Sequence, residues 1–194
     1  MTPLAPSALD PGLKAEACRA LGQLILLASV LALGACANTG TLGPRAAAPL
    51  QSTTGNTATG AVTFVQSGDK VKVSGVVTGL KANTEHGFHV HEKGDCSSGD
   101  GMSTGGHFNP LGAPHGNHDK GAHHVGDLPS LQADASGVAR FSFESDSITL
   151  GGATGIVDRG MIVHRDPDDY STQPTGNSGP RIACAVITRA DLSK

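Results

Sequence analysis

Hydrophobic and polar residues alternate with a period of two in several stretches from about Thr59 onward. Val71 and Val73 are separated by Lys72, and similar alternation recurs over residues 139–143 and 182–186. Successive side chains of a strand point to opposite faces, so this pattern predicts half-buried antiparallel strands. Because no window shows a convincing helical stripe, we expect one all-β domain, a barrel or a sandwich.

Two segments do not follow the alternation, residues 92–130 and 165–180. Both are long and rich in Gly, Pro and Asp, and the first is also rich in His. Structureless loops of that length in a compact domain are usually functional or wrongly assigned, and here they hold most of the unusual chemistry. We therefore expect these two loops to carry the chemistry of the protein.

Composition supports the same class and excludes one kind of partner. The 194 residues include 27 glycines and only 3% aromatics, which suits short strands and many turns better than a helical bundle. The net charge is −3, and no Lys/Arg run is longer than two residues. Nucleic-acid binding needs a basic patch, so a nucleic-acid partner is not expected.

The N-terminal part of the chain has the features of an export signal. Residues 21–35 form an apolar run, which is shorter than the roughly 20 residues that span a membrane and fits a secretory signal. The run ends in Leu33-Gly34-Ala35-Cys36, which resembles the bacterial lipoprotein box with a lipidated cysteine. The alternative is a plain signal peptide with an incidental Cys36. The stretch before the run is long and carries Asp10 and Glu16, which a start codon assigned too far upstream would explain.

These features divide the chain into three parts. Residues 1–35 are a lipoprotein-type signal peptide, residues 36–58 are a flexible tether of small and polar residues, and residues 59–194 are the folded domain. The predicted location is the bacterial periplasm, with a lipid as the only membrane attachment. Cys96 and Cys184 are then the two cysteines left in an exported domain, and they predict one disulfide.

The histidines form a candidate metal site. All nine fall between His86 and His164, and His89 and His91 share one face of a predicted strand. An H-x-H pair alone is weak support, but further histidines and Asp127 follow in the first loop, and His164 ends a later strand-like stretch. Imidazole suits copper and zinc, and a carboxylate beside imidazoles suits zinc. The residues therefore indicate two such metals in an oxidising compartment.

Five segments carry a resemblance to a known family. They are GFHVHEKGDC, GGHFNP, HHVGDLP, MIVHRDPDD and TGNSGPRIACAVI, within residues 87–187. In this order they resemble the signature segments of copper/zinc superoxide dismutases. The resemblance implies a Greek-key β-barrel or sandwich of about eight antiparallel strands. It also implies an oxidoreductase that converts superoxide, its substrate, to O₂ and H₂O₂ with copper and zinc as cofactors.

The resemblance also implies a role for each matching residue. Four histidines would bind copper: His89, His91, His107 and His164. Three histidines and one carboxylate would bind zinc: His107, His115, His124 and Asp127.

His107 would bridge the two metals as an imidazolate and take part in proton transfer. Arg181 matches the active-site arginine, and Asp168 matches the carboxylate that links histidines of the two metal sites. Cys96 and Cys184 match the family's disulfide.

Some positions stay open or differ from the family. His123 is adjacent to His124 and is the alternative zinc ligand, although the spacing to Asp127 favours His124. His86 is expected to pack and hydrogen-bond without binding metal, and His118 and His123 to be exposed.

The stretch between Asp169 and Arg181 has no charged residue, and it resembles the bacterial periplasmic branch instead of the cytosolic enzymes. Substrate guidance and subunit pairing therefore cannot be carried over from the cytosolic enzymes, and a homodimer is an open expectation. The rival function is a non-enzymatic copper/zinc-binding lipoprotein that buffers metal. Such a protein needs the ligands but has no use for Arg181 or for a histidine shared by two metals.

Overall fold

A computed structural model describes residues 43–190 of the chain. This part contains ten short strands and one 3₁₀ turn, joined by loops. In chain order they are β1 (Arg45–Ser52), β2 (Thr59–Ser67), β3 (Lys70–Thr78), β4 (Glu85–His86), β5 (Phe88–His91), η1 (Met102–Thr104), β6 (Leu131–Gln132), β7 (Ala139–Ser145), β8 (Gly160–His164), β9 (Arg181–Val186) and β10 (Thr188–Arg189).

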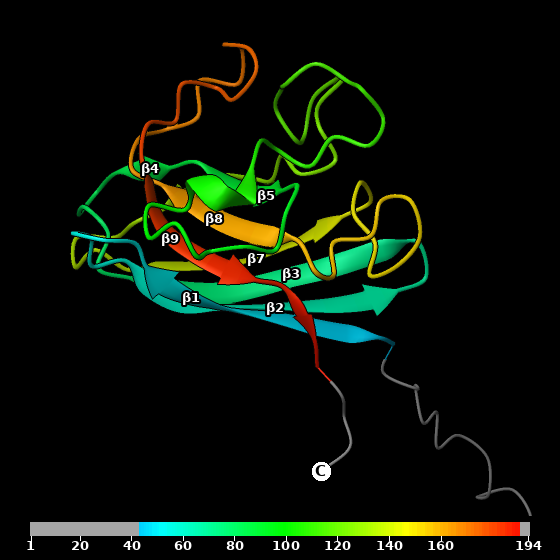
Figure 1. The fold of residues 1–194 in the computed structure, drawn as a ribbon, viewed down its shortest axis with the longest axis horizontal. Coiled ribbons are helices and arrows are strands. Elements are labelled where there is room, and N and C mark those ends of the chain that lie inside the picture. The colour runs from blue at the N-terminus through cyan, green and yellow to red at the C-terminus, as the bar shows by residue number, and fades with distance from the viewer. Residues whose placement is uncertain (1–42, 191–194) are drawn as a thin grey trace, which may run out of the picture. The chain divides into compact units, whose positions relative to one another are not determined.

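The strands form one curled antiparallel sheet in the order β5-β8-β9-β1-β2-β3-β7, with β10 also paired to β1 (Figure 1). A separate two-stranded ribbon joins β4 to β6. Strands distant in the chain are neighbours, such as β1 with β9 and β3 with β7. The predicted all-β class is confirmed, and the sheet has the non-local pairings of a Greek-key arrangement.

The predicted alternation is seen in the burial of the side chains. Alternate residues of β2 and β3 are fully buried, namely Val62, Phe64, Val71 and Val73. In β5 and β8 every residue is buried. These strands have a core face like the others, and their second face is covered by the long loops. The predicted metal ligands of the strands lie under that cover.

β1 corrects the predicted tether. Residues 36–58 were expected to be flexible, but residues 45–52 form a strand between β9 and β2. Ala46, Ala48 and Leu50 alternate into the core and are almost fully inaccessible. The pattern was missed because alanine and proline are poor strand formers, so RAAAPLQS does not look like a strand.

Residues 1–42 lie outside the described residues, and so do the predicted signal peptide and Cys36. Within residues 43–190, no helix is long and apolar enough to span a membrane.

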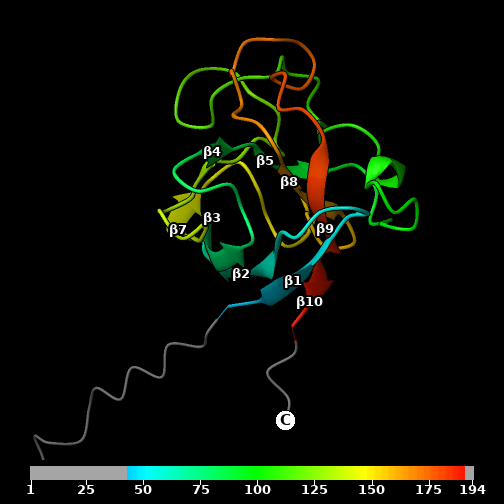
Figure 2. The same ribbon diagram turned by 90° about the vertical axis from the view of Figure 1, so that its left-hand side faces the viewer.

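The two predicted loops lie at the same side of the sheet (Figures 1 and 2). The first connects β5 to β6 and contains η1, and the second connects β8 to β9. The first loop returns to β5 through backbone hydrogen bonds. Val90 donates to Gly126 over 2.9 Å, and Phe108 donates to Val90 over 2.8 Å. A Cβ at Gly126 would overlap the carbonyl oxygen of Val90, so this close return requires glycine.

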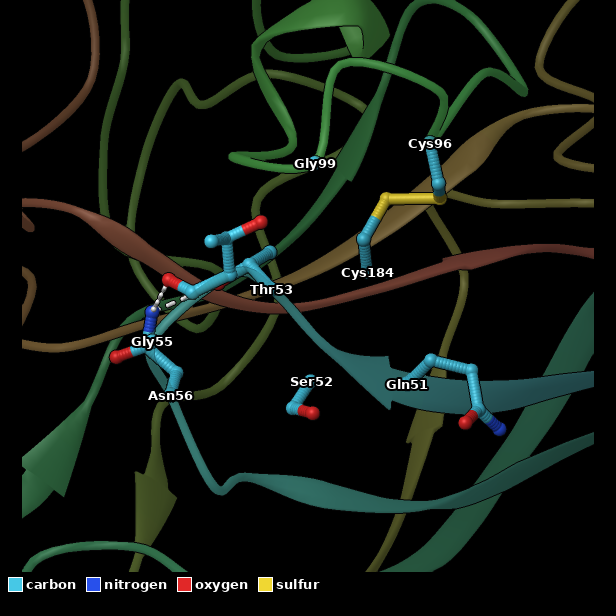
Figure 3. Close-up of a pocket in the computed structure, with 9 residues that line it drawn as sticks. Gln51, Ser52, Thr53, Gly55, Asn56, Cys96, Gly99 and Cys184 are labelled. Atoms are coloured by element: carbon cyan, nitrogen blue, oxygen red, sulfur yellow. Dashed lines mark hydrogen bonds between the residues drawn. A yellow bond between two sulfur atoms is a disulfide. The ribbon is translucent and has the colours of Figure 1, made fainter.

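The predicted disulfide between Cys96 and Cys184 is confirmed, and it closes a separation of 88 residues. It lies beside a cleft of about 350 Å³ at the end of β1 (Figure 3). Thr54 donates its N–H to Gly99 over 2.8 Å, and the Thr53 hydroxyl donates to the Arg181 carbonyl over 2.7 Å. The end of β1 therefore holds both the disulfide loop and the start of β9.

Candidate metal centre

β5 presents two histidines on the face opposite the core. Phe88 and Val90 are fully buried in the core, and the strand alternation directs His89 and His91 to the other face. Isolated β-bridges join His89 to Asp127 and His91 to His107. The returning loop thus places His107 and Asp127, which are 16 or more positions away in the chain, beside the two histidines of β5.

Four histidines form the first group. Their ligand atoms lie within 4.8 Å of one another, and all four residues are buried: His89, His91, His107 and His164. Each has one buried ring nitrogen without a hydrogen-bond partner: Nδ1 of His89 and Nε2 of the other three. A buried polar atom without a partner costs about 1–3 kcal/mol. Four such nitrogens in one place can all ligate a single cation, and a set of ligands made only of imidazoles suits copper.

Three histidines and one carboxylate form the second group: His107, His115, His124 and Asp127. Asp127 Oδ1 lies 2.8 Å from His107 Nδ1 and 3.2 Å from His124 Nδ1. His115 Nδ1 is 3.0 Å from Asp127 Oδ2. Tetrahedral zinc with bonds of 2.0–2.1 Å separates its ligand atoms by about 3.3 Å. The four side chains therefore need little movement to hold zinc.

His107 belongs to both groups through different nitrogens. Its Nδ1 contacts Asp127 in the second group, while its buried Nε2 has no hydrogen-bond partner and belongs to the first. The two nitrogens lie on opposite sides of the imidazole ring. The geometry therefore allows one ring to join two metals.

The second nitrogen of each of three histidines is held by a hydrogen bond. His91 Nδ1 donates to the Gly105 carbonyl, and His164 Nδ1 donates to the Gly179 carbonyl, each over 3.0 Å. His89 donates Nε2–H to Asp168 over 2.6 Å. Such bonds fix the tautomer and direct the other nitrogen. The nitrogens left free are those of the first group.

Asp168 links the two groups. Its Oδ2 accepts from His89 and its Oδ1 lies 2.9 Å from His115 Nε2. The backbone N–H of Tyr170 also donates to Oδ1, over 2.8 Å. Gly176 lies against this contact at φ +65°, where a Cβ would overlap Asp168 Oδ1. One carboxylate therefore orients one ring in each metal group.

The pKa values describe the ionisation of the metal-free site. Burial lowers the pKa of His91 and His164 well below the usual value, and burial lowers that of His107 to about 4 despite the attraction of Asp127. These rings are neutral at pH 7, the form that binds metal.

The two carboxylates and His115 respond to one another. Burial opposes their charged forms, but the hydrogen bonds between them outweigh it. The pKa of Asp127 and that of Asp168 fall well below their usual range, and the pKa of His115 rises to about 9. The carboxylates are therefore charged at pH 7, and His115 holds a proton until a metal replaces it.

Arg181 at the start of β9 has its guanidinium fixed by three acceptors. It donates to the Gly101 carbonyl over 2.7 Å, to the Thr104 hydroxyl over 2.8 Å and to the Gly105 carbonyl over 2.7 Å. Its charge contributes to the lowered pKa of His91. Arg181 is therefore a fixed positive charge near the four-histidine group.

The other histidines lie outside both groups. His86 is buried and donates Nδ1–H to the His164 carbonyl over 2.9 Å, as a packing residue would. His123 donates Nδ1–H to the His124 carbonyl over 2.7 Å, and the second group contains His124. His118 was expected to be exposed, but its side chain is only 8% exposed because it packs on Phe143 and His123.

Sequence reasoning did not identify several residues that support the site. Thr53 holds the Arg181 backbone, Thr104 binds its side chain, and Gln173 contacts His115. Their partners are distant in the chain and are often backbone groups, so no local motif indicates them. Gln173 lies in a segment that was noted only for its resemblance to one branch of the family.

The fold and the site together define a class of protein. A curled antiparallel domain carries a four-histidine group and a three-histidine-plus-carboxylate group that share one histidine. This is a metalloprotein suited to a copper and zinc pair.

Comparison with known proteins identifies the family. Residues 58–187 match the model of copper/zinc superoxide dismutase. The chain is 46% identical over 134 residues to a Cu-Zn superoxide dismutase of Paramecium bursaria Chlorella virus 1, covering 66% of this chain and 71% of the relative. It is 39% identical over 182 residues to that of Deinococcus radiodurans, covering 87% and 97%.

An extracellular Cu-Zn superoxide dismutase of Drosophila melanogaster is 43% identical over 136 residues, covering 66% of this chain and 74% of the relative. The crystal structure of the clock protein EA4 superposes with a TM-score of 0.70 at 43% identity, covering 77% of this chain and 97% of that one. The chain belongs to the copper/zinc superoxide dismutase family. It is an oxidoreductase that dismutates superoxide with copper and zinc as cofactors.

Proposed function

We propose how the two metals are divided between the two groups. Copper is held by Nδ1 of His89 and by Nε2 of three histidines: His91, His107 and His164. Zinc is held by His107, His115, His124 and Asp127, so that His107 bridges the metals. The observation that carries this assignment is the set of buried ring nitrogens without partners, one in each histidine of the first group. Beside them, Asp127 lies 2.8–3.2 Å from ring nitrogens of the three histidines of the second group.

When bound there, copper supplies the redox couple by which two superoxide ions and two protons become O₂ and H₂O₂. Zinc has no redox chemistry, so its side of the site is structural. His107 is the residue suited to move a proton. Its Nδ1 is fixed on the Asp127 side, and its Nε2 faces the copper group, where it can hold a proton and pass it to the peroxide product.

Arg181 attracts and orients the substrate. Its guanidinium is held by three oxygen acceptors, none of which is a carboxylate, so its positive charge is not neutralised by a direct ion pair. Fixed charge beside a catalytic centre raises the rate at which an oppositely charged substrate arrives. Burial lowers the pKa of Arg181, but an arginine remains protonated in any case.

Metal content and dismutase activity, measured on the same purified samples, test this division. Asp127→Ala should lose zinc and keep copper with part of the activity, because the four-histidine group is intact. His164→Ala should lose copper and all activity but keep zinc. If both variants lose the same metal, the two-site assignment is wrong.

We also propose that the protein is exported and anchored through a lipid on Cys36. The lipoprotein-like box and the preceding apolar run support this, and a disulfide is typical of oxidising compartments. The Deinococcus relative aligns with 87% of this chain, more than residues 43–190 represent, so part of the N-terminal segment is shared.

Because β1 begins at Arg45, only residues 37–44 separate Cys36 from the sheet. Fully extended at 3.3–3.6 Å per residue, they reach about 26–29 Å. A lipidated protein would thus work close to the membrane.

Replacing Cys36 with Ser tests the anchor. The variant should move to the soluble periplasmic fraction with full activity, because a lipid chain contributes about 0.8 kcal/mol per buried CH₂ to membrane binding. A variant that stays in the membrane fraction as firmly as the parent would show that the cysteine is not the anchor. A homodimer is an open expectation, and light scattering of the released enzyme would measure the oligomeric state.

A further inference from the structure

The side chain of Gln173 bonds to both backbone groups of His115. The His115 N–H donates to Gln173 Oε1 over 2.8 Å, and Gln173 Nε2 donates to the His115 carbonyl over 2.9 Å. The two residues are 58 positions apart, one in each long loop. The glutamine amide therefore takes the place that a neighbouring strand would have beside His115.

The same loop holds the His115 ring. Asp168, five positions before Gln173, contacts His115 Nε2 over 2.9 Å. His115 is thus fixed at its ring by a carboxylate and at its backbone by an amide. With both fixed, the ring has little freedom to turn, and its Nδ1 stays 3.0 Å from Asp127 Oδ2.

The alternative is that Gln173 is an ordinary polar residue on an exposed loop. Gln132, another exposed glutamine of the domain, is an example of such a residue. Its amide donates one long hydrogen bond of 3.4 Å to the adjacent Ala133 carbonyl. Gln173 also has one such local bond, 3.4 Å from its Nε2 to the Ser171 carbonyl. In addition, both ends of its amide bond to one distant residue at short distances. That pairing is specific to the His115 backbone.

We propose that Gln173 is a positioning residue for the zinc site, which acts by fixing the backbone of His115 so that the ring is preoriented for the metal. The inference rests on the proposed role of His115 as a zinc ligand. Residues that orient metal ligands typically change metal affinity by about 10- to 100-fold when removed.

The test compares zinc affinities of the full enzyme with those of Gln173→Ala, Gln173→Glu and the control Gln132→Ala. Zinc is titrated against a competing chelator, and Co²⁺ in the zinc site reports ligand geometry through its visible spectrum. We expect Gln173→Ala to weaken zinc binding about 10- to 100-fold and to alter the Co²⁺ spectrum. Gln173→Glu keeps the acceptor for the His115 N–H and should fall between Gln173→Ala and the parent. Gln132→Ala should match the parent.

Copper affinity, measured on the same variants, separates positioning from general damage to the fold. A zinc-selective loss in Gln173→Ala, with copper affinity within twofold of the parent, supports the inference. Equal losses of both metals, or a zinc affinity within twofold of the parent, would overturn it.

His115→Ala distinguishes the failure of this inference from failure of the proposed site. If His115→Ala loses zinc while Gln173→Ala does not, only the role of Gln173 is wrong. If His115→Ala binds zinc like the parent, the proposed ligand set is wrong and the inference falls with it.

Discussion

Replacing Asp168 by Asn keeps the size of the side chain but removes its charge and one acceptor. Asp168 accepts from His89 Nε2 over 2.6 Å and lies 2.9 Å from His115 Nε2, and its side chain is 1% exposed. With both Nδ1 atoms directed at metals, both Nε2 atoms carry hydrogen. An amide offers only one oxygen to these two donors, so at least one hydrogen bond must be lost.

The size of the effect follows from that lost bond. A hydrogen bond to a charged group contributes about 1.5–3 kcal/mol, which corresponds to roughly 10- to 150-fold in affinity. Copper binds nitrogen ligands more tightly than zinc does, so zinc should be lost first. We expect the zinc dissociation constant of Asp168→Asn to rise about 10- to 100-fold while copper remains at one equivalent.

The assay is zinc competition with a chelator on copper-loaded enzyme, with metal content measured before and after. Asp166→Asn is the matched control, because Asp166 lies in the same loop and its carboxylate pairs with the exposed Arg165. If Asp168→Asn retains the zinc affinity of the parent, or if Asp166→Asn loses as much, the carboxylate does not link the sites as described.

Three further predictions concern Arg181, the proton on His115 and the disulfide. Replacing Arg181 by Lys, by Ala and by Glu should lower the activity progressively in that order at constant metal content. The reason is that charge beside a site changes association rates by roughly 10- to 1,000-fold. Its salt dependence, measured by stopped flow, should weaken in the Ala form, and equal rates for the Arg and Glu forms would contradict the assigned role.

The pKa of His115 is raised from 6.5 to about 9, so the metal-free protein keeps a proton on His115 between pH 6.5 and about pH 9. Zinc binding at pH 7 should therefore release it, with affinity rising about tenfold per pH unit until about pH 9. Calorimetry in two buffers measures the released proton, and no release at pH 7 would be inconsistent with this. Removing the disulfide by a double Cys96→Ala and Cys184→Ala change should lower the unfolding free energy by about 4–5 kcal/mol, as expected for a closed loop of 88 residues. Urea denaturation tests this, and a loss under 1 kcal/mol would refute it.

The sequence was sufficient for the features that depend on local pattern. The alternation of hydrophobic and polar residues predicts β3, β7 and β9, and the clustered histidines indicate a metal centre. The sequence does not predict β1, because alanines such as Ala46 and Ala48 have low strand propensity. In the folded sheet they are buried and pack well between neighbouring strands. Propensity describes an isolated strand, whereas β1 is stabilised by neighbours on both sides.

The supporting contacts could not be predicted for a different reason. Thr53 bonds to the backbone of a residue 128 positions away, and Gln173 bonds to one 58 positions away. A backbone partner has no side-chain identity, so no pair of residue types in the sequence indicates such a bond. Only the path of the folded loops brings these groups together.

The place of β1 has a consequence for the order in which the domain folds. β1 leaves the ribosome first, but its neighbours on one side, β9 and β10, are the last strands to be made. Cys184 lies in β9, so the disulfide also awaits the end of synthesis. Contacts this distant in the chain form slowly, because a long loop must close before they contribute stability. A nascent chain therefore remains without a completed sheet until its final residues emerge, which leaves it in a suitable state for passage through a membrane as an unfolded polypeptide.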